Sequence, residues 1–241
     1  MTSTPTLSLR AAVATVARDR SWPLTCLIYG ACALTLIGLP IAAGFALDSL
    51  DNTRKGYGYP LPPWTDWTLR WLSGILALLI DFVFFVLPLL AGGMLLICVS
   101  IGMLVAGVKD PAVTGQALTA LVALCGLATV VMFLCSAAPV GRLLFAGEGR
   151  IEDALSMRVL QLATSRGAGP IFLRARLLSL PAYLPAALLA LAAYGLTLIS
   201  FPGQPLALML LVWLLLSALV MAHLVVVQLY AAAERETMRM I

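Results

Sequence analysis

Long apolar stretches with almost no charge dominate the sequence. Four such stretches occur, at residues 21–47, 71–108, 111–141 and 177–233. A helix that crosses a bilayer needs about 20 apolar residues, because each residue adds about 1.5 Å and the hydrocarbon layer is about 30 Å thick. The first and third stretches therefore predict one membrane helix each, over 22–47 and 117–139.

The fourth stretch has 57 uncharged residues and is too long for one membrane helix. Near its middle stands Pro202-Gly203-Gln204-Pro205, where two prolines flank a glycine and break the helical pattern. We expect two membrane helices, over 178–200 and 206–230. Pro181 and Pro185 predict a kink in the first of them.

The second stretch, 71–108, would reach about 55 Å as a single helix, far beyond the hydrocarbon layer. Pro88, Gly92 and Gly93 offer a turn near its middle. The pattern predicts two short helices, over 71–88 and 93–108. Their length leaves open whether they form a full or a shallow hairpin.

The distribution of basic residues supports this hairpin, since cytoplasmic flanks of membrane helices collect Lys and Arg. With it, eleven basic residues fall on one side: those of the N-terminus, of the 142–176 connection and of the C-terminal tail. Arg54, Lys55, Arg70 and Lys109 fall on the other. We therefore expect six membrane-embedded helices with both termini in the cytoplasm.

Two segments outside the membrane helices have amphipathic patterns. Residues 7–18 place Leu9, Val13 and Val16 at helical spacing, with arginines nearby. Residues 151–165 carry a clearer apolar stripe with acidic residues on other faces. Both predict helices at the membrane surface, which either seat the bundle or dock a partner protein.

Composition fits one membrane domain over 1–241, an all-α helical bundle. Hydrophobic residues make up 62% of the chain and charged residues 11%, whereas soluble domains are nearer one quarter charged. The 13 arginines and 2 lysines form no dense basic block, which argues against nucleic acid as a partner. The cysteine and histidine spacings match no metal or haem motif, so no cofactor and no metal site is evident.

The connection after the first predicted helix contains Pro60-Leu61-Pro62-Pro63-Trp64-Thr65-Asp66-Trp67. This string resembles a motif of the prokaryotic membrane family catalogued as domain of unknown function 4013 (DUF4013), in which it lies between the first two hydrophobic helices. Pro63 and Thr65 stand where the family tends to have acidic residues, so this loop is less acidic. The resemblance implies a polytopic membrane fold and carries no established activity.

The chemistry of the string suggests two roles. Prolines favour extended backbone, and tryptophans are enriched at the headgroup layer. The simpler hypothesis is an interfacial anchor for the following helix, and the alternative is a contact surface for a partner. The residues concerned are Pro60, Pro62, Trp64, Asp66, Trp67 and Trp71.

Asp81 and His223 are the candidate functional residues within the membrane. A carboxylate near the bilayer centre costs at least about 2.5 kcal/mol, so Asp81 needs either a proton- or cation-relay role or a partner that ties helices together. His223 is the single histidine. It could ligate a haem or pigment, but a structural hydrogen bond is the simpler interpretation.

No catalytic motif is recognisable, and we expect a protein that is not an enzyme. The favoured hypothesis is a scaffold, assembly or accessory subunit of a larger complex in the plasma membrane of a bacterium, in contact with other membrane subunits or with copies of itself. The alternative is a small transporter or channel that uses Asp81 and the broken helix near Pro88–Gly93.

Overall fold

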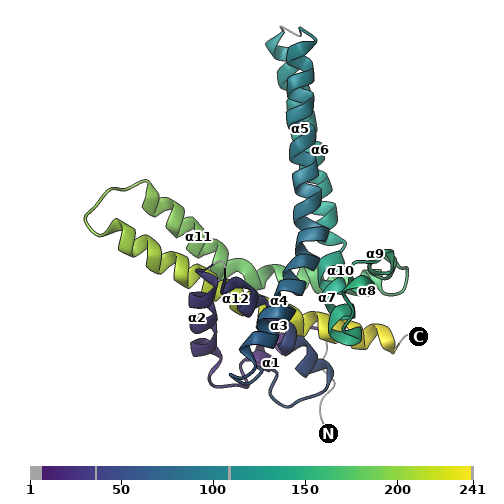
Figure 1. Ribbon diagram of the computed structural model, residues 1–241, viewed down its shortest axis with the longest axis vertical. Coiled ribbons are helices and arrows are strands. Elements are labelled where there is room, and N and C mark those ends of the chain that lie inside the picture. Colours follow the sequence, from purple (N-terminus) through teal and green to yellow (C-terminus); the bar gives the residue numbers. More distant parts are fainter. Residues whose placement is uncertain (1–6, 36, 108–109, 240–241) are drawn as a thin grey trace.

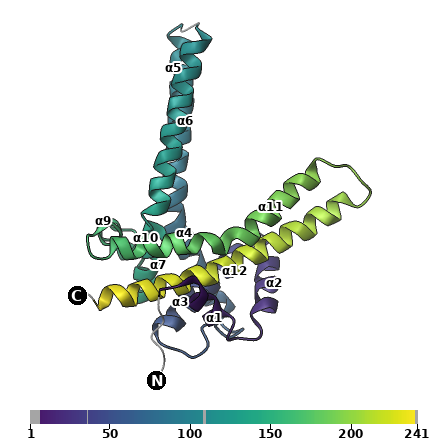
Figure 2. The same ribbon diagram turned by 180° about the vertical axis from the view of Figure 1, so that it is seen from behind.

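The computed structural model describes residues 7–35, 37–107 and 110–239, and every regular element within them is helical. Two helical hairpins project in different directions from the rest of the chain, which we call the base (Figures 1 and 2). One hairpin pairs α5 (Leu87–Val105) with α6 (Pro111–Leu134), and the other pairs α11 (Leu184–Thr197) with the first half of α12 (Gln204–Met238). The base consists of α1 to α4, α7 to α10 and the second half of α12.

The elements follow one another in this order: α1 (Leu9–Val16), α2 (Trp22–Ala33), α3 (Leu39–Arg54), α4 (Trp67–Asp81), the π-helical turn η1 (Phe82–Val86), α5 (Leu87–Val105), α6 (Pro111–Leu134), α7 (Ala137–Glu148), α8 (Ile151–Ala154), α9 (Met157–Thr164), α10 (Gly169–Ser179), the 3-10 turn η2 (Leu180–Tyr183), α11 (Leu184–Thr197) and α12 (Gln204–Met238).

Four of these helical segments are long and apolar enough to cross a membrane. They are Trp67–Val105, Ala112–Glu148, Gly169–Thr197 and Gln204–Met238. The chain therefore has the composition and helix lengths of a membrane protein. The predicted count of six membrane-embedded helices is not confirmed.

One difference from the prediction lies at Pro88–Gly93, where the chain does not turn. Helix runs through Trp67–Val105, and Pro88 lies in the first turn of α5. The preceding turn is π-helical, with the amide of Leu87 donating to the carbonyl of Phe82. A widened turn accommodates a proline that cannot donate an amide proton. A full turn in hydrocarbon would instead leave several backbone groups without partners.

A second difference lies in 22–47, which is divided between α2 and α3. Thr35 caps the break, since its Oγ1 donates to the carbonyl of Cys32 and accepts from the amide of Gly38, each at 3.0 Å. Pro40 then begins α3. The two helices fold against each other, with the rings of Tyr29 and Phe45 stacked 4.0 Å apart.

This fold-back moves Arg54 to the side of the C-terminal end of α12. Its Nε and Nη2 donate to the carboxylate of Glu234 at 2.7 and 2.9 Å. A Cβ at Gly147, near the end of α7, would lie 2.7 Å from the same guanidinium. The prediction that Arg54 lies opposite the C-terminal tail is therefore wrong.

The second half of α12 is part of the buried core, and Tyr230, Leu224 and Leu229 are almost fully buried there. Along its length α12 packs against α1, α2, α3, α7 and α10. A buried polar cluster of three residues lies between α3 and α12. Thr53 Oγ1 donates to Gln228 Oε1 at 2.7 Å, and Gln228 Nε2 donates to Ser49 Oγ at 3.2 Å. These bonds fix α12 against α3.

Helices α3 and α4 cross at close range because glycines face the contact. A Cβ on Gly74 would lie 1.8 Å from the carbonyl oxygen of Pro40, and one on Gly44 would lie 2.0 Å from that of Arg70. Only a residue without a side chain permits this backbone approach. The crossing fixes α4, whose last residue is Asp81, against α3.

Candidate functional site: a polar cavity at the root of the hairpins

Asp81 forms an ion pair with Arg142. The carboxylate is at the last residue of α4, immediately before the π-helical turn, and it accepts a hydrogen bond from Nη2 of Arg142 in α7. Nε of Arg142 is buried and has no hydrogen-bond partner among the described residues. The pair links two elements 61 residues apart and leaves one guanidinium donor unsatisfied.

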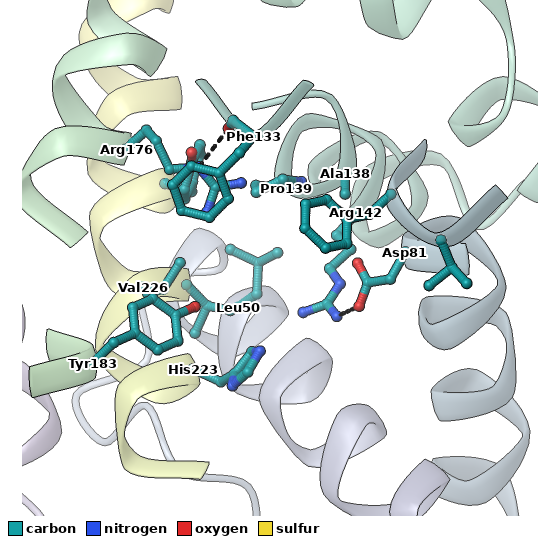
Figure 3. A pocket seen from close by; sticks show the side chains of 14 residues that line it. Leu50, Asp81, Phe133, Ala138, Pro139, Arg142, Arg176, Tyr183, His223 and Val226 are labelled. Carbon is teal, nitrogen blue, oxygen red and sulfur yellow. Dashed lines mark hydrogen bonds and ion pairs between the residues drawn. The ribbon is translucent and has the colours of Figure 1, made fainter. Parts of the chain in front are cut away.

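Beside this pair is a cavity of about 210 Å³ at the root of both hairpins (Figure 3). Apolar side chains form most of its lining, and the polar groups come from four helical segments. The lining residues are Leu50, Asp81, Phe85, Val86, Phe133, Ala138, Pro139, Arg142, Arg176, Tyr183, His223, Val226, Val227 and Tyr230.

Arg176, from α10, is the second guanidinium in the cavity wall and is 7% exposed. Its Nε donates to the carbonyl of Phe133 at 2.9 Å. The guanidinium carbon lies 4.0 Å from the centre of the Phe133 ring and 5.9 Å from that of Tyr230. These contacts hold the side chain in place, while no described residue accepts from its terminal nitrogens.

His223 and the two tyrosines complete the polar lining. Nδ1 of His223 is 2.8 Å from the carbonyl of Leu219. A carbonyl can only accept, so Nδ1 carries the proton and Nε2 remains an acceptor. The ring meets Tyr183 edge-on, with centroids 5.8 Å apart. The hydroxyl of Tyr230 donates to Ser136 Oγ at 2.7 Å.

The two membrane residues singled out from the sequence thus line one cavity, although 142 positions separate Asp81 from His223. Sequence reasoning missed Arg142 and Arg176. Both stand at the boundaries of uncharged stretches, and in the sequence they count as part of the basic 142–176 connection. Their position next to an apolar run is shared by ordinary helix-flanking arginines, so the sequence carried no signal that singled them out.

The Pro60–Trp67 string lies elsewhere, around the buried side chain of Arg70. This arginine is 3% exposed and uses all three nitrogens. It donates to Asp48 Oδ2 at 2.8 Å, to the hydroxyl of Tyr29 at 2.7 Å and to the carbonyl of Pro63 at 2.9 Å. Burial raises the pKa of the Asp48 carboxyl, and the guanidinium opposes that shift.

The aromatic residues of the string stack on the same cluster. The ring of Tyr29 lies 5.5 Å from that of Trp64 and 6.0 Å from that of Trp67. Both indoles keep an exposed face, at 42% and 39% of their surface. Nε1 of Trp71 donates to the carbonyl of Ile37 at 2.9 Å.

The remaining residues of the string shape its backbone. Pro60 and Pro62 are buried, and Asn52 Nδ2 donates to the carbonyl of Pro60 at 3.3 Å. Asp66 is exposed and adopts a left-handed conformation with φ of 58° just before α4. The string therefore forms an ordered cap on the crossing of α3 and α4.

Comparison with known families gives one match. The family model described as "Protein of unknown function (DUF4013)" matches residues 27–192, well over half of the chain. This confirms the resemblance to that family. The matched range includes Asp81, Arg142 and Arg176 and ends before α12. No curated protein and no solved structure matches the chain.

Proposed function

The chain belongs to the DUF4013 family of proteins of unknown function, and we propose that it is a non-catalytic membrane protein that serves as a scaffold or accessory subunit of a larger membrane complex. The observation that carries this proposal is the α5/α6 hairpin, which beyond its root has no other helix of the described residues alongside it (Figures 1 and 2). In this proposal the protein acts by binding the membrane helices of other subunits.

The hairpin exposes almost all of its surface. No described residue of α5 or α6 is buried, and one contact between the two helices is that of Cys125 Sγ with the carbonyl of Gly92, at 3.8 Å. A lone apolar hairpin is stable in lipid, since each helix satisfies its own backbone. Its outer surface is thus free to pack against helices of other chains.

Glycines on the outer surface support this role. A Cβ added at Gly93, Gly102, Gly115 or Gly126 would meet no atom within 4 Å. A helical glycine costs about 0.5–1 kcal/mol relative to alanine, and here no internal contact requires it. On α6, Gly115, Thr119 and Gly126 share one face, where small residues allow another helix to approach closely.

We further propose that the protein lies in the plasma membrane of a prokaryote with the base and both termini in the cytoplasm. Between α5 and α6 the sequence has a single basic residue, Lys109, and the 198–203 connection has none. The other 14 of the 15 basic residues belong to the base or to the base ends of the long helices. This asymmetry is typical of the cytoplasmic side.

The test is native isolation. The full chain extracted from its own membranes in mild detergent should migrate as a complex with other membrane proteins or with further copies of itself. Replacing Gly115 and Gly126 together by leucine should release the partner, while Ala120→Leu, which places a leucine on another face of α6, should retain it. A wild-type protein that always migrates alone would exclude a scaffold function.

A second candidate is a small transporter or channel, favoured by the π-helical turn that follows Asp81 and by the adjacent cavity. Irregular turns inside membrane helices often occur at functional sites. The irregularity lies at Phe82–Val86 rather than at Pro88–Gly93. Flux of protons or monovalent cations into proteoliposomes should then differ between wild type and Asp81→Asn, and equal flux in both would count against this candidate.

A further inference from the structure

We propose that the cavity between the hairpin roots binds one anionic phospholipid, with the phosphate held by Arg142 and Arg176 and an acyl chain along the apolar lining. This site is separate from the outer surface of the α5/α6 hairpin. Binding of a lipid here and binding of another protein there can therefore succeed or fail independently.

Unsatisfied donors point to an anionic ligand. Nε of Arg142 is buried without a partner, and Arg176 is bonded within the described chain only through its own Nε. A buried donor left without an acceptor costs about 1–3 kcal/mol, and more when it is charged. Phosphate oxygens satisfy guanidinium donors well, because the planar fork can make two parallel bonds.

The charges of the cavity favour the same ligand. Two guanidiniums face it, and Asp81 is the only carboxylate in the lining. His223 donates its Nδ1 proton to the carbonyl of Leu219, and a neutral imidazole in this tautomer adds no charge to the lining. One positive charge is left without a counter-charge in a largely apolar wall, where an isolated ion is costly. A single phosphodiester carries the charge needed to balance it.

The apolar part of the lining suits an acyl chain. Phe85 and Val86 of the π-helical turn line the cavity and are each 37% exposed, so the cavity opens along the lipid-facing side of the hairpin. In the orientation proposed above, the guanidiniums lie where the base meets the membrane-embedded helices, at the depth of phospholipid headgroups. Basic pockets between membrane helices bind anionic headgroups in this way.

Native mass spectrometry of the full chain in neutral detergent tests the assignment. The protein should bind one molecule of phosphatidylglycerol. Its affinity for this lipid should be at least tenfold higher than for phosphatidylcholine with the same acyl chains, a difference of about 1.4 kcal/mol. Arg176→Gln should remove most of that preference. Arg174→Gln is the matched control, because Arg174 is exposed two residues earlier in α10, and it should leave the preference unchanged.

A second variant keeps the test decisive if Arg176→Gln fails to fold. Asp81→Asn releases Nη2 of Arg142 from its carboxylate partner, so affinity for phosphatidylglycerol should increase. A decrease in this affinity, which is expected if Asp81 only maintains the shape of the cavity, would overturn the proposal. The proposal is also overturned if wild type binds both lipids equally, if oleate binds as tightly as phosphatidylglycerol, or if inorganic phosphate alone displaces the lipid.

Discussion

Arg70 is the residue on which the packing of the Pro60–Trp67 string depends. Its guanidinium joins three segments: Asp48 in α3, Tyr29 in α2 and the backbone of Pro63. Because every nitrogen is bonded and the side chain is buried, no smaller cation reproduces the arrangement. Lysine would supply the charge without the planar fork.

Replacing Arg70 by methionine should therefore destabilise the fold by about 3 kcal/mol, since a buried pair that loses one partner leaves the other uncompensated. Asp48→Asn should cost clearly less, because Asp48 is one-third exposed and burial already disfavours its charged form. Arg70→Lys should fall between them. Unfolding in mixed micelles gives all three values, and equal costs for Arg70→Met and Asp48→Asn would contradict this account.

At the residue scale the sequence identified the acidic member of the cavity but not its basic members. Asp81 and His223 stand out because each is polar inside an apolar run. Arg142 and Arg176 look like ordinary helix-flanking charges. Their burial depends on which distant helices surround them, and hydropathy along the chain contains no information on that.

At the scale of elements, glycines separate into those that the fold requires and those that it does not. Gly74 sits at the α3/α4 crossing, where a Cβ would lie 1.8 Å from the carbonyl oxygen of Pro40. Gly93 in α5 has open space around it. Replacement by alanine should therefore change the free energy of unfolding in opposite directions at the two sites.

Gly74→Ala should lower the free energy of unfolding by about 1–3 kcal/mol, the usual cost of overpacking, because α3 and α4 must move apart. Gly93→Ala should raise it by about 0.5–1 kcal/mol, because alanine is the better helix former. Mixed-micelle unfolding of the isolated chain measures both. A tolerated alanine at Gly74 would mean that the crossing is looser than described.

Helix positions followed from hydropathy, but the breaks did not. The apolar stretches correctly indicated helices, whereas prolines alone could not tell a turn from a continuous helix. Pro88 is absorbed by the π-helical turn before it, while Thr35 and Gly38 break 22–47, where the sequence shows no charge. Which outcome occurs depends on whether neighbouring groups can satisfy the freed backbone, and that is a tertiary property.

For the whole molecule, the fold-back of α2 and α3 changes the expected topology. Six membrane helices would put the 56–63 loop across the membrane from the 142–176 connection. The structure instead joins Arg54, just before that loop, to Glu234 near the C-terminus. In the orientation proposed above, both hairpins would enter the membrane from one side, and only their tips would reach the other.

Cysteine labelling distinguishes the two arrangements in a variant whose five native cysteines are replaced. In intact cells a membrane-impermeant maleimide should label Ala106→Cys, at the α5/α6 tip, and should label Gly167→Cys only after permeabilisation. Gly58→Cys decides between the arrangements. Protection equal to that of Gly167→Cys supports two hairpins rising from a cytoplasmic base, whereas labelling in intact cells would mean that residues 22–47 cross the bilayer after all.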